Sequence, residues 1–99
     1  PFRSEVERWR PLVASIFWPE EVDNVLRVMT CESGGWPDAD SQANRGLMQI
    51  NQVHIRRIEA MGYTWDQMFE PEPNLRVAYA ISEGYQWGPW SCAYITGVL

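Results

Sequence analysis

Glu32 is the residue of this sequence best suited to acid–base chemistry, because an apolar helical stripe leads directly to it. Val22, Val25, Leu26 and Met29 have the i, i+3, i+4, i+7 spacing of a buried helix face, which continues to Glu32. Burial penalises the charged carboxylate and raises its pKa toward that of a general acid at neutral pH. Cleavage of a glycosidic bond requires such an acid at the leaving oxygen. The alternative is a surface glutamate that turns to solvent, because the helix dipole disfavours a carboxylate near a helix C-terminus. The same effect would also raise the pKa of the group.

A second carboxylate is the usual requirement of glycosidases, and the residues after Glu32 offer two candidates. Asp38 and Asp40 follow it by six and eight residues. Aspartates beside proline and serine are more commonly turn formers, so both roles stay open for them.

The sequence has few residues suited to metal binding, nucleophilic catalysis or phosphate binding. His54 is the single histidine, and we interpret it as a helix surface residue because Arg56 and Arg57 follow it. The sequence has no cluster with metal-ligand spacing, no credible Ser–His pairing and no glycine-rich phosphate loop. We therefore expect no metal and no cofactor.

Helices are the elements expected to position Glu32. A first helix begins with a possible capping box at Ser4–Glu7, although Pro11 favours a true start near that proline, and Pro19 ends it. The second helix, over 20–33, opens with acidic residues that complement the helix dipole. Gly34-Gly35 stops it. Glu32 is thus expected at the end of the second helix.

A hairpin or loop and two further helices are expected after the glycine pair. Residues 36–44 are rich in Pro, Asp, Ser and Asn, which is typical of a loop or irregular hairpin. The apolar spacing predicts a third helix over 55–61, and Asn74 is expected to cap a fourth helix that ends at Gly84. The tail 85–92 is aromatic and contains bends.

Tryptophan is unusually frequent, with six in 99 residues. Aromatic faces stack on sugar rings, and large aromatic residues also fill cores, so both roles are open for most of them. Trp9 and Trp18 are assigned to the core. The candidates for a sugar-binding groove are Trp36, Trp65, Trp87 and Trp90.

Length and charge restrict the classes of function. Ninety-nine residues predict one domain over 1–99, and we interpret the start at Pro1 as that of a processed chain or an excised segment. The net charge of −5 excludes phosphate-driven nucleic-acid binding, which needs clustered Lys and Arg. No apolar run is long enough for a membrane span.

The two cysteines, Cys31 and Cys92, suit a single disulfide in a small domain. Such a bridge would close a loop of about 60 residues and contribute about 4 kcal/mol in the chain-entropy model. Two reduced, buried thiols are the alternative. Count and size favour the bridge.

Four segments in this order resemble signatures of the lysozyme-like superfamily. CESGG at 31–35 and GLMQIN at 46–51 resemble the E-S-G and G-L-M-Q segments of soluble-type bacterial lytic transglycosylases, and also the E-S and G-I-L-Q-I-N of animal lysozymes. DQMFEPEPNL at 66–75 is similar to the transglycosylase D-L-F-D-P-x-x-N-I segment. WGPWSC at 87–92 resembles the W-x-x-W region near a cysteine in animal lysozymes. The resemblance spans about 20–95 and is strongest to the soluble lytic transglycosylases.

The resemblance implies a mainly α, lysozyme-like α+β fold: a helical domain with a small β-hairpin or irregular segment flanking a glycan groove. Glu32 matches the catalytic glutamate of the family. A Cys31–Cys92 bridge would pin the aromatic tail against the catalytic helix, and Trp87 is the residue we place against Glu32. The further residues expected to bind substrate are Ser33, Asn44, Met48, Gln49, Asn51 and Tyr85. Met48 is equally open to a core role, and Asn51 to a helix cap.

The resemblance also implies a reaction, the cleavage of the β-1,4 bond between N-acetylmuramic acid and N-acetylglucosamine in peptidoglycan. Animal lysozymes have an aspartate two residues before the glycine that corresponds to Gly46, and Asn44 occupies that position here. Lytic transglycosylases use one glutamate as acid and then base, which fits this sequence better. Their A-Y-N-A-G segment is missing from this sequence, and Ala78-Tyr79-Ala80 matches it only in part.

Two alternatives to a transglycosylase follow. One is a muramidase that uses a second carboxylate, and the other is a binding module for peptidoglycan or chitooligosaccharides that has lost catalysis. We expect peptidoglycan glycan strands as partner, a monomer, and a secreted, periplasmic or cell-wall location.

Overall fold

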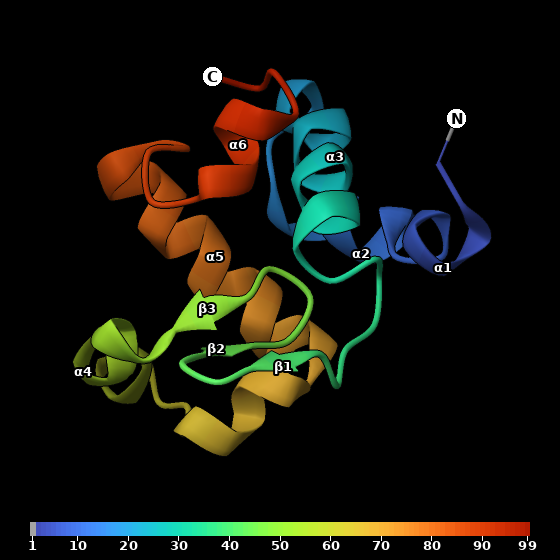
Figure 1. The fold of residues 1–99 in the computed structure, drawn as a ribbon. Coiled ribbons are helices and arrows are strands. Elements are labelled where there is room, and N and C mark those ends of the chain that lie inside the picture. The colour runs from blue at the N-terminus through green and yellow to red at the C-terminus, as the bar shows by residue number, and fades with distance from the viewer. Residues whose placement is uncertain (1) are drawn as a thin grey trace.

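A mainly helical domain with one small antiparallel sheet is seen in the computed structural model, which describes residues 2–99 (Figure 1). The α-helices are α1 (Ser4–Glu7), α2 (Arg10–Ile16), α3 (Val22–Glu32), α4 (Ile55–Ala60), α5 (Pro71–Tyr85) and α6 (Ser91–Ile95). The short 3-10 helices are η1 (Pro19–Glu21), η2 (Gln52–His54) and η3 (Trp65–Phe69). The strands are β1 (Asp40–Ser41), β2 (Asn44–Arg45) and β3 (Ile50–Asn51). This architecture confirms the expected mainly α fold with a small β segment.

The first two helices differ in part from the sequence prediction. Arg3 is the N-cap of α1, and the Ser4 hydroxyl donates to the neighbouring Glu5 carboxylate at 3.0 Å, so the predicted capping box is wrong. Pro11 lies in the first turn of α2, where its missing N–H costs no hydrogen bond. The predicted helix start near Pro11 is confirmed.

Helix α3 has the apolar stripe that its spacing predicts. Val22, Val25, Leu26 and Met29 are all buried. After Glu32 the Gly34 amide donates back to the Met29 carbonyl at 3.0 Å. Gly35 follows at φ +89°, and a Cβ there would lie 2.3 Å from the Glu5 carbonyl oxygen, so only glycine fits this close passage beside α1. The glycine pair therefore ends the helix, as predicted.

The sheet is an antiparallel meander in the order β1-β2-β3. Asp40 pairs with Arg45 across the hairpin, and Asn44 pairs with Asn51 on β3. Residues 36–44 thus include a turn and a hairpin, as expected. The apolar run 46–50 that links β2 to β3 is buried throughout.

Helix α5 begins earlier than the sequence predicts. Glu70 is its N-cap, and Pro71 starts the first turn, where proline is favoured. Asn74 lies inside the helix and is fully buried, so the prediction that it caps the helix is wrong. Its side chain is instead used for long-range hydrogen bonds.

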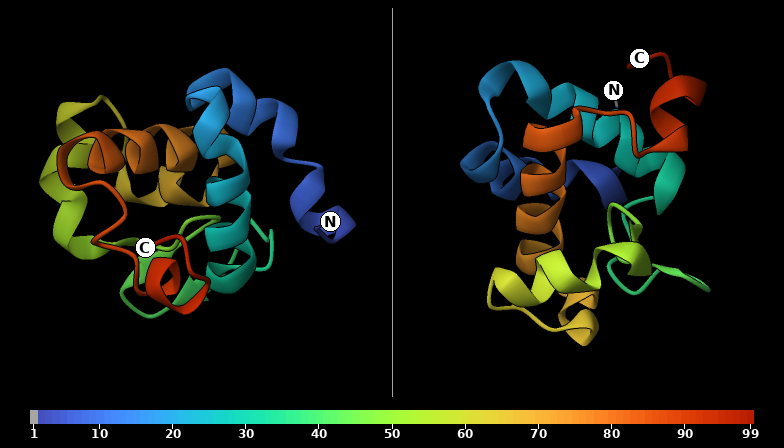
Figure 2. Two further views of the ribbon diagram at one scale, coloured as in Figure 1. Left: turned by 90° about the horizontal axis from the view of Figure 1, so that it is seen from above. Right: turned by 90° about the vertical axis from the view of Figure 1, so that its left-hand side faces the viewer.

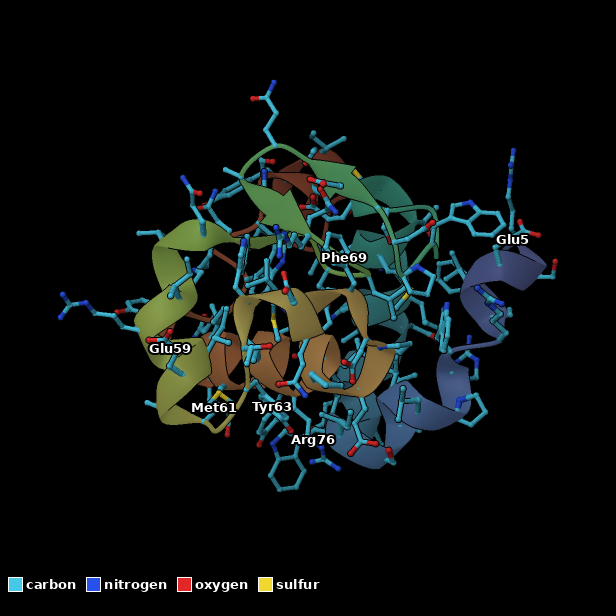
Figure 3. The ribbon with its side chains drawn as sticks, turned by 90° about the horizontal axis from the view of Figure 1, so that it is seen from below. Glu5, Glu59, Met61, Tyr63, Phe69 and Arg76 are labelled. Atoms are coloured by element: carbon cyan, nitrogen blue, oxygen red, sulfur yellow. A yellow bond between two sulfur atoms is a disulfide. The ribbon has the colours of Figure 1, made fainter. Side chains whose placement is uncertain are left out.

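Helix α5 runs through the middle of the molecule, and α2, α3 and the sheet are arranged around it (Figures 1 and 2). The tail after α5 returns to place α6 beside α3. Seen from below, Glu5 on α1 and Glu59 on α4 lie at opposite ends, and Phe69 lies where the sheet meets the start of α5 (Figure 3). The core is therefore shared by helices and sheet. No helix among residues 2–99 is long and apolar enough to cross a membrane.

Trp18 is a further correction to the sequence prediction. It was expected in the core, but 58% of its surface is exposed. Trp18 has an extended backbone between α2 and Pro19, which begins η1. The side chain therefore lies at a corner, outside the packed helix faces.

Candidate active site

Glu32 is the last residue of α3, and its carboxyl group lines a pocket with a volume of about 310 Å³. One wall comes from the sheet and η2, through Asn44, Gln49–Asn51, Val53 and His54. The opposite wall comes from the tail before α6, through Pro89, Trp90 and Ser91, and Ile81 on α5 completes the pocket. Glu32 therefore faces the Gly46–Asn51 segment that the sequence associates with it.

The pKa of Glu32 is raised, because burial penalises its charged form. The Cys92 backbone N–H donates a hydrogen bond to the carboxylate and partly offsets this effect. A raised pKa keeps the acid protonated at higher pH than an ordinary glutamate. The pocket thus contains a carboxyl group that can donate a proton.

Glu32 supplies the only carboxyl group among the residues 2–99 that line this pocket. Asp38 is exposed in the loop before β1, and Asp40 is exposed on β1. Neither lines the pocket. A pair of facing carboxylates, as most glycosidases use, is not formed by the described residues.

Asn44 and Asn51 form a polar pair on the floor of the pocket. They are cross-strand partners, and the Asn51 amide donates to the Asn44 side-chain oxygen at 3.0 Å. The Asn51 side-chain oxygen also accepts from the Val53 amide at 2.9 Å and caps η2. Asn51 therefore both caps a helix and lines the pocket, as its two sequence interpretations allow.

Gln49 lines the pocket and also holds the hairpin in place. Its side-chain amide donates to the carbonyl oxygens of Ala39 at 3.1 Å and Gly46 at 3.0 Å, and its side-chain oxygen accepts from the Ser41 hydroxyl. Its φ of +49° is unusual for a residue with a side chain. These bonds fix the turn that carries the chain into β3.

Asn74 is a structural residue of the site that sequence reasoning assigned to a helix cap. Its side-chain oxygen accepts from the Met48 amide at 3.0 Å. Its side-chain amide donates to the carbonyl oxygens of Arg45 and Met68, both at 2.9 Å. Gly46 is so close to Asn74 and Met68 that a Cβ there would overlap both. Asn74 thus fixes the Gly46–Met48 turn that precedes Gln49.

Trp90 is the tryptophan that shares the pocket with Glu32. Its indole N–H donates to the Met48 carbonyl at 2.9 Å, which joins the tail to the Gly46–Asn51 segment. Trp87, which the sequence analysis places against Glu32, packs against Trp90 instead, with 5.2 Å between the ring centroids. The indole N–H of Trp87 donates to the Glu21 carboxylate at 2.9 Å. Trp87 lines a second pocket instead.

The other expected substrate-binding residues lie outside the pocket lining. Met48 is fully buried in the core. Ser33 caps the end of α3, and its hydroxyl accepts from the Gly35 amide at 3.1 Å. Tyr85 lies at the end of α5 with 62% of its surface exposed. Because their side chains face elsewhere, these three residues do not join Glu32 in the pocket.

His54 belongs to the pocket, although its sequence neighbours indicated a surface residue. Its pKa is lowered by burial and by the positive charge of Arg57, so the imidazole is neutral at physiological pH. A neutral imidazole can both donate and accept hydrogen bonds to a sugar. Its position three residues after Asn51, in the turn of η2, is the signal that could have identified it.

The Cys31–Cys92 disulfide is present, and each of its cysteines is the sequence neighbour of a residue that lines the pocket, Glu32 and Ser91. It joins the last turn of α3 to the first turn of α6, with 5.8 Å between the two Cα atoms. The predicted bridge is confirmed. Because Cys31 precedes Glu32 and Cys92 donates to its carboxylate, the bridge holds the tail against the acid.

No group of side chains among residues 2–99 has the arrangement of a metal site.

Comparisons with known proteins identify the family of this chain. A family model described as a lysozyme-like domain matches residues 14–92 of this chain. No curated protein and no solved structure matches it. Since the match includes most of the 99 residues, Glu32 and the residues that line its pocket among them, the chain belongs to this lysozyme-like domain family.

Proposed function

We propose that this domain cleaves the β-1,4 bond between N-acetylmuramic acid and N-acetylglucosamine in peptidoglycan, as a lytic transglycosylase with Glu32 as acid and then base. Membership of a lysozyme-like family indicates peptidoglycan-related glycan cleavage in general. The observation that supports the specific reaction is the single carboxyl group among the described residues that line the pocket.

In the first step, Glu32 protonates the oxygen that links the two sugars. The bond from this oxygen to C1 of the muramic acid breaks, N-acetylglucosamine leaves with the proton, and positive charge develops at C1. The raised pKa of Glu32 supports this role, because the carboxyl group must hold its proton until the sugar arrives.

In the second step, the Glu32 carboxylate takes the proton from the 6-hydroxyl group of the same muramic acid. The oxygen of this hydroxyl bonds to C1 and forms a 1,6-anhydro ring. Glu32 is protonated again, so the reaction consumes no water and needs no second carboxylate. A reaction that needs only one carboxyl group fits this pocket, because its other polar lining groups are neutral at physiological pH. They are Asn44, Gln49, Asn51, His54 and Ser91.

The same neutral groups are suited to binding sugars. Amide, hydroxyl and imidazole groups form hydrogen bonds with hydroxyl and N-acetyl groups, and the largely buried Trp90 adds apolar lining. The Cys31–Cys92 disulfide and a peptidoglycan substrate together support an extracytoplasmic location.

The test is digestion of purified peptidoglycan followed by mass spectrometry of the released fragments. We expect fragments with 1,6-anhydro ends, each lighter by one water than the corresponding hydrolysis product. Glu32→Gln keeps the shape of the side chain but cannot donate a proton, so we expect a loss of about 10²–10⁴-fold in rate.

Asp40→Asn is the matched control, since Asp40 is the exposed carboxylate closest in the sequence to the hairpin turn. It should leave rate and products unchanged. Reducing ends among the products, with loss of activity in Asp40→Asn, would establish the muramidase alternative. Retained wall binding without any released fragment would establish the binding module.

A further inference from the structure

A second pocket, with a volume of about 380 Å³, lies on the other side of the Trp87–Trp90 ring pair. It is formed where the end of α2 and η1 meet residues 79–87 at the end of α5 and just after it, and α2 also packs against α5. Its volume is in the range of sites that bind small ligands, about 300–1,000 Å³. The proposed catalytic chemistry uses none of its residues.

Aromatic rings form much of this pocket. Phe17 and Tyr79 meet edge to face, with ring centroids 5.5 Å apart, and Trp18 stands beside them with most of its surface open to solvent. An exposed tryptophan at the edge of a cavity offers its ring face to a ligand. Trp87 closes the inner end.

Carboxylates line the same pocket without basic partners. Glu21 accepts from the Trp87 indole at 2.9 Å and from the Asn24 amide at 3.2 Å, and Glu83 accepts from the Tyr79 hydroxyl at 2.8 Å. Glu20 is exposed at the rim. The salt bridges formed within residues 2–99 involve none of these three glutamates. Neutral donors thus hold two carboxylates in place and leave their charge uncompensated.

Aromatic faces combined with fixed carboxylates favour an organic cation. A cation gains from the ring quadrupole as well as from the carboxylates. A metal ion fits less well, since no group of three acidic, histidine or cysteine side chains in the described chain has metal-site spacing. The geometry points to a binding site for a primary alkylammonium group.

We assign this ammonium group to the side chain of a diamino acid in a peptide attached to the glycan, an assignment that rests on the proposed function. Trp90 lines the pocket that contains Glu32, Trp87 lines the second pocket, and the two ring centroids are 5.2 Å apart. The assignment therefore requires that a peptide branch of the bound glycan passes around this ring pair to the second pocket. The pocket would select glycan strands whose peptides carry a free amine.

The first experiment measures binding without catalysis. Nα-acetyl-lysine methylamide is titrated into Glu32→Gln and followed by NMR, with the Nε-acetylated compound as the uncharged probe. We expect shifts at Trp18, Tyr79 and Trp87 with the amine only. Glu21→Gln and Trp18→Ala should each weaken binding about fivefold or more.

Glu59→Gln is the matched control, because it removes an equal charge from α4, away from both pockets. Added to Glu32→Gln, this substitution should leave the affinity for the amine unchanged. Trp18→Ala removes an exposed side chain and is expected to fold normally, so it keeps the test valid if Glu21→Gln is unstable. No binding of the amine, or equal binding of both probes, would overturn the site.

The second experiment tests the source of the amine. The otherwise unmodified protein digests peptidoglycan with free amines and the same material after N-acetylation. Faster release from the amine-bearing wall, abolished by Trp18→Ala, would support the assignment, and equal rates would overturn it. If neither wall is cleaved, the proposed function fails, while the NMR titration still decides whether the ammonium site exists.

Discussion

Glu32 combines two opposing requirements in one side chain. In the proposed role of proton donor it benefits from burial, which raises its pKa, but the same burial makes its charged form costly to the folded protein. Replacing a functional polar group of this kind commonly stabilises a protein. The residue that supports the proposed reaction is therefore expected to reduce stability at neutral pH.

Glu32→Gln should raise the melting temperature at neutral pH and have a smaller effect below pH 4.5, the ordinary pKa of the group. Between these conditions the folded protein holds a proton that the unfolded chain releases, so the wild type loses stability as pH rises through this window. Calorimetry at the two pH values checks this, with about 4–8 °C per kcal/mol expected for a domain of this size.

Asp40→Asn, at an exposed position, provides the reference for the calorimetry. Its melting temperature should follow that of the wild type at both pH values. An equal gain for Glu32→Gln at both pH values would show that burial of the charge is not the cause.

At the level of elements, the turn between β2 and β3 is held by a residue of another element. Asn74 on α5 bonds the Met48 amide and the carbonyl oxygens of Arg45 and Met68. The turn has a buried backbone and a strained Gln49, so it cannot be stabilised by its local sequence alone. Helix α5 therefore shapes the pocket floor.

Asn74→Ala should lower the free energy of unfolding by about 3 kcal/mol or more, because it leaves two buried backbone groups and one partly buried one unpaired. Denaturant unfolding measures the change, and peptidoglycan digestion should fall with it. Gln67→Ala, in the exposed capping box of η3, is the control at about 1 kcal/mol. A similar small loss for both variants would contradict the role of Asn74.

The sequence predicts local features of this fold better than features that depend on distant parts of the chain. The α3 stripe and the Gly34 stop follow from helical periodicity and turn chemistry, which act over a few residues. The bonds from Asn74 to Met48 and from Trp87 to Glu21 join residues 26 and 66 positions apart. No spacing rule anticipates them, so Trp87 was expected in the wrong pocket and His54 outside the correct one.

For the whole molecule, the disulfide connects α3, which ends at Glu32, to the tail. Cys31 and Cys92 are 61 positions apart, so the bridge restricts most of the unfolded chain. It should contribute about 4 kcal/mol in the chain-entropy model, a large part of the stability of a small domain.

Reduction of the disulfide should decrease peptidoglycan digestion at temperatures where the helices are still folded. The tail would loosen first, because the Cys92 amide and the Trp90 ring would no longer be held against Glu32. Activity and far-ultraviolet circular dichroism are followed together under increasing reductant, with Cys31→Ser/Cys92→Ser as a variant free of reductant effects. Unchanged digestion by that variant would refute the coupling.

The last residues of the pocket to be translated are Pro89, Trp90 and Ser91, which form one of its walls. Glu32 leaves the exit tunnel long before them, and the cysteine that bonds Cys31 follows 61 positions later. During this interval the glutamate has neither the Cys92 amide nor the Trp90 ring beside it, and the burial that raises its pKa in the folded protein is incomplete. Under the proposed function, the pocket around Glu32 is therefore complete only after residues 89–92 have been made and the Cys31–Cys92 bond has formed.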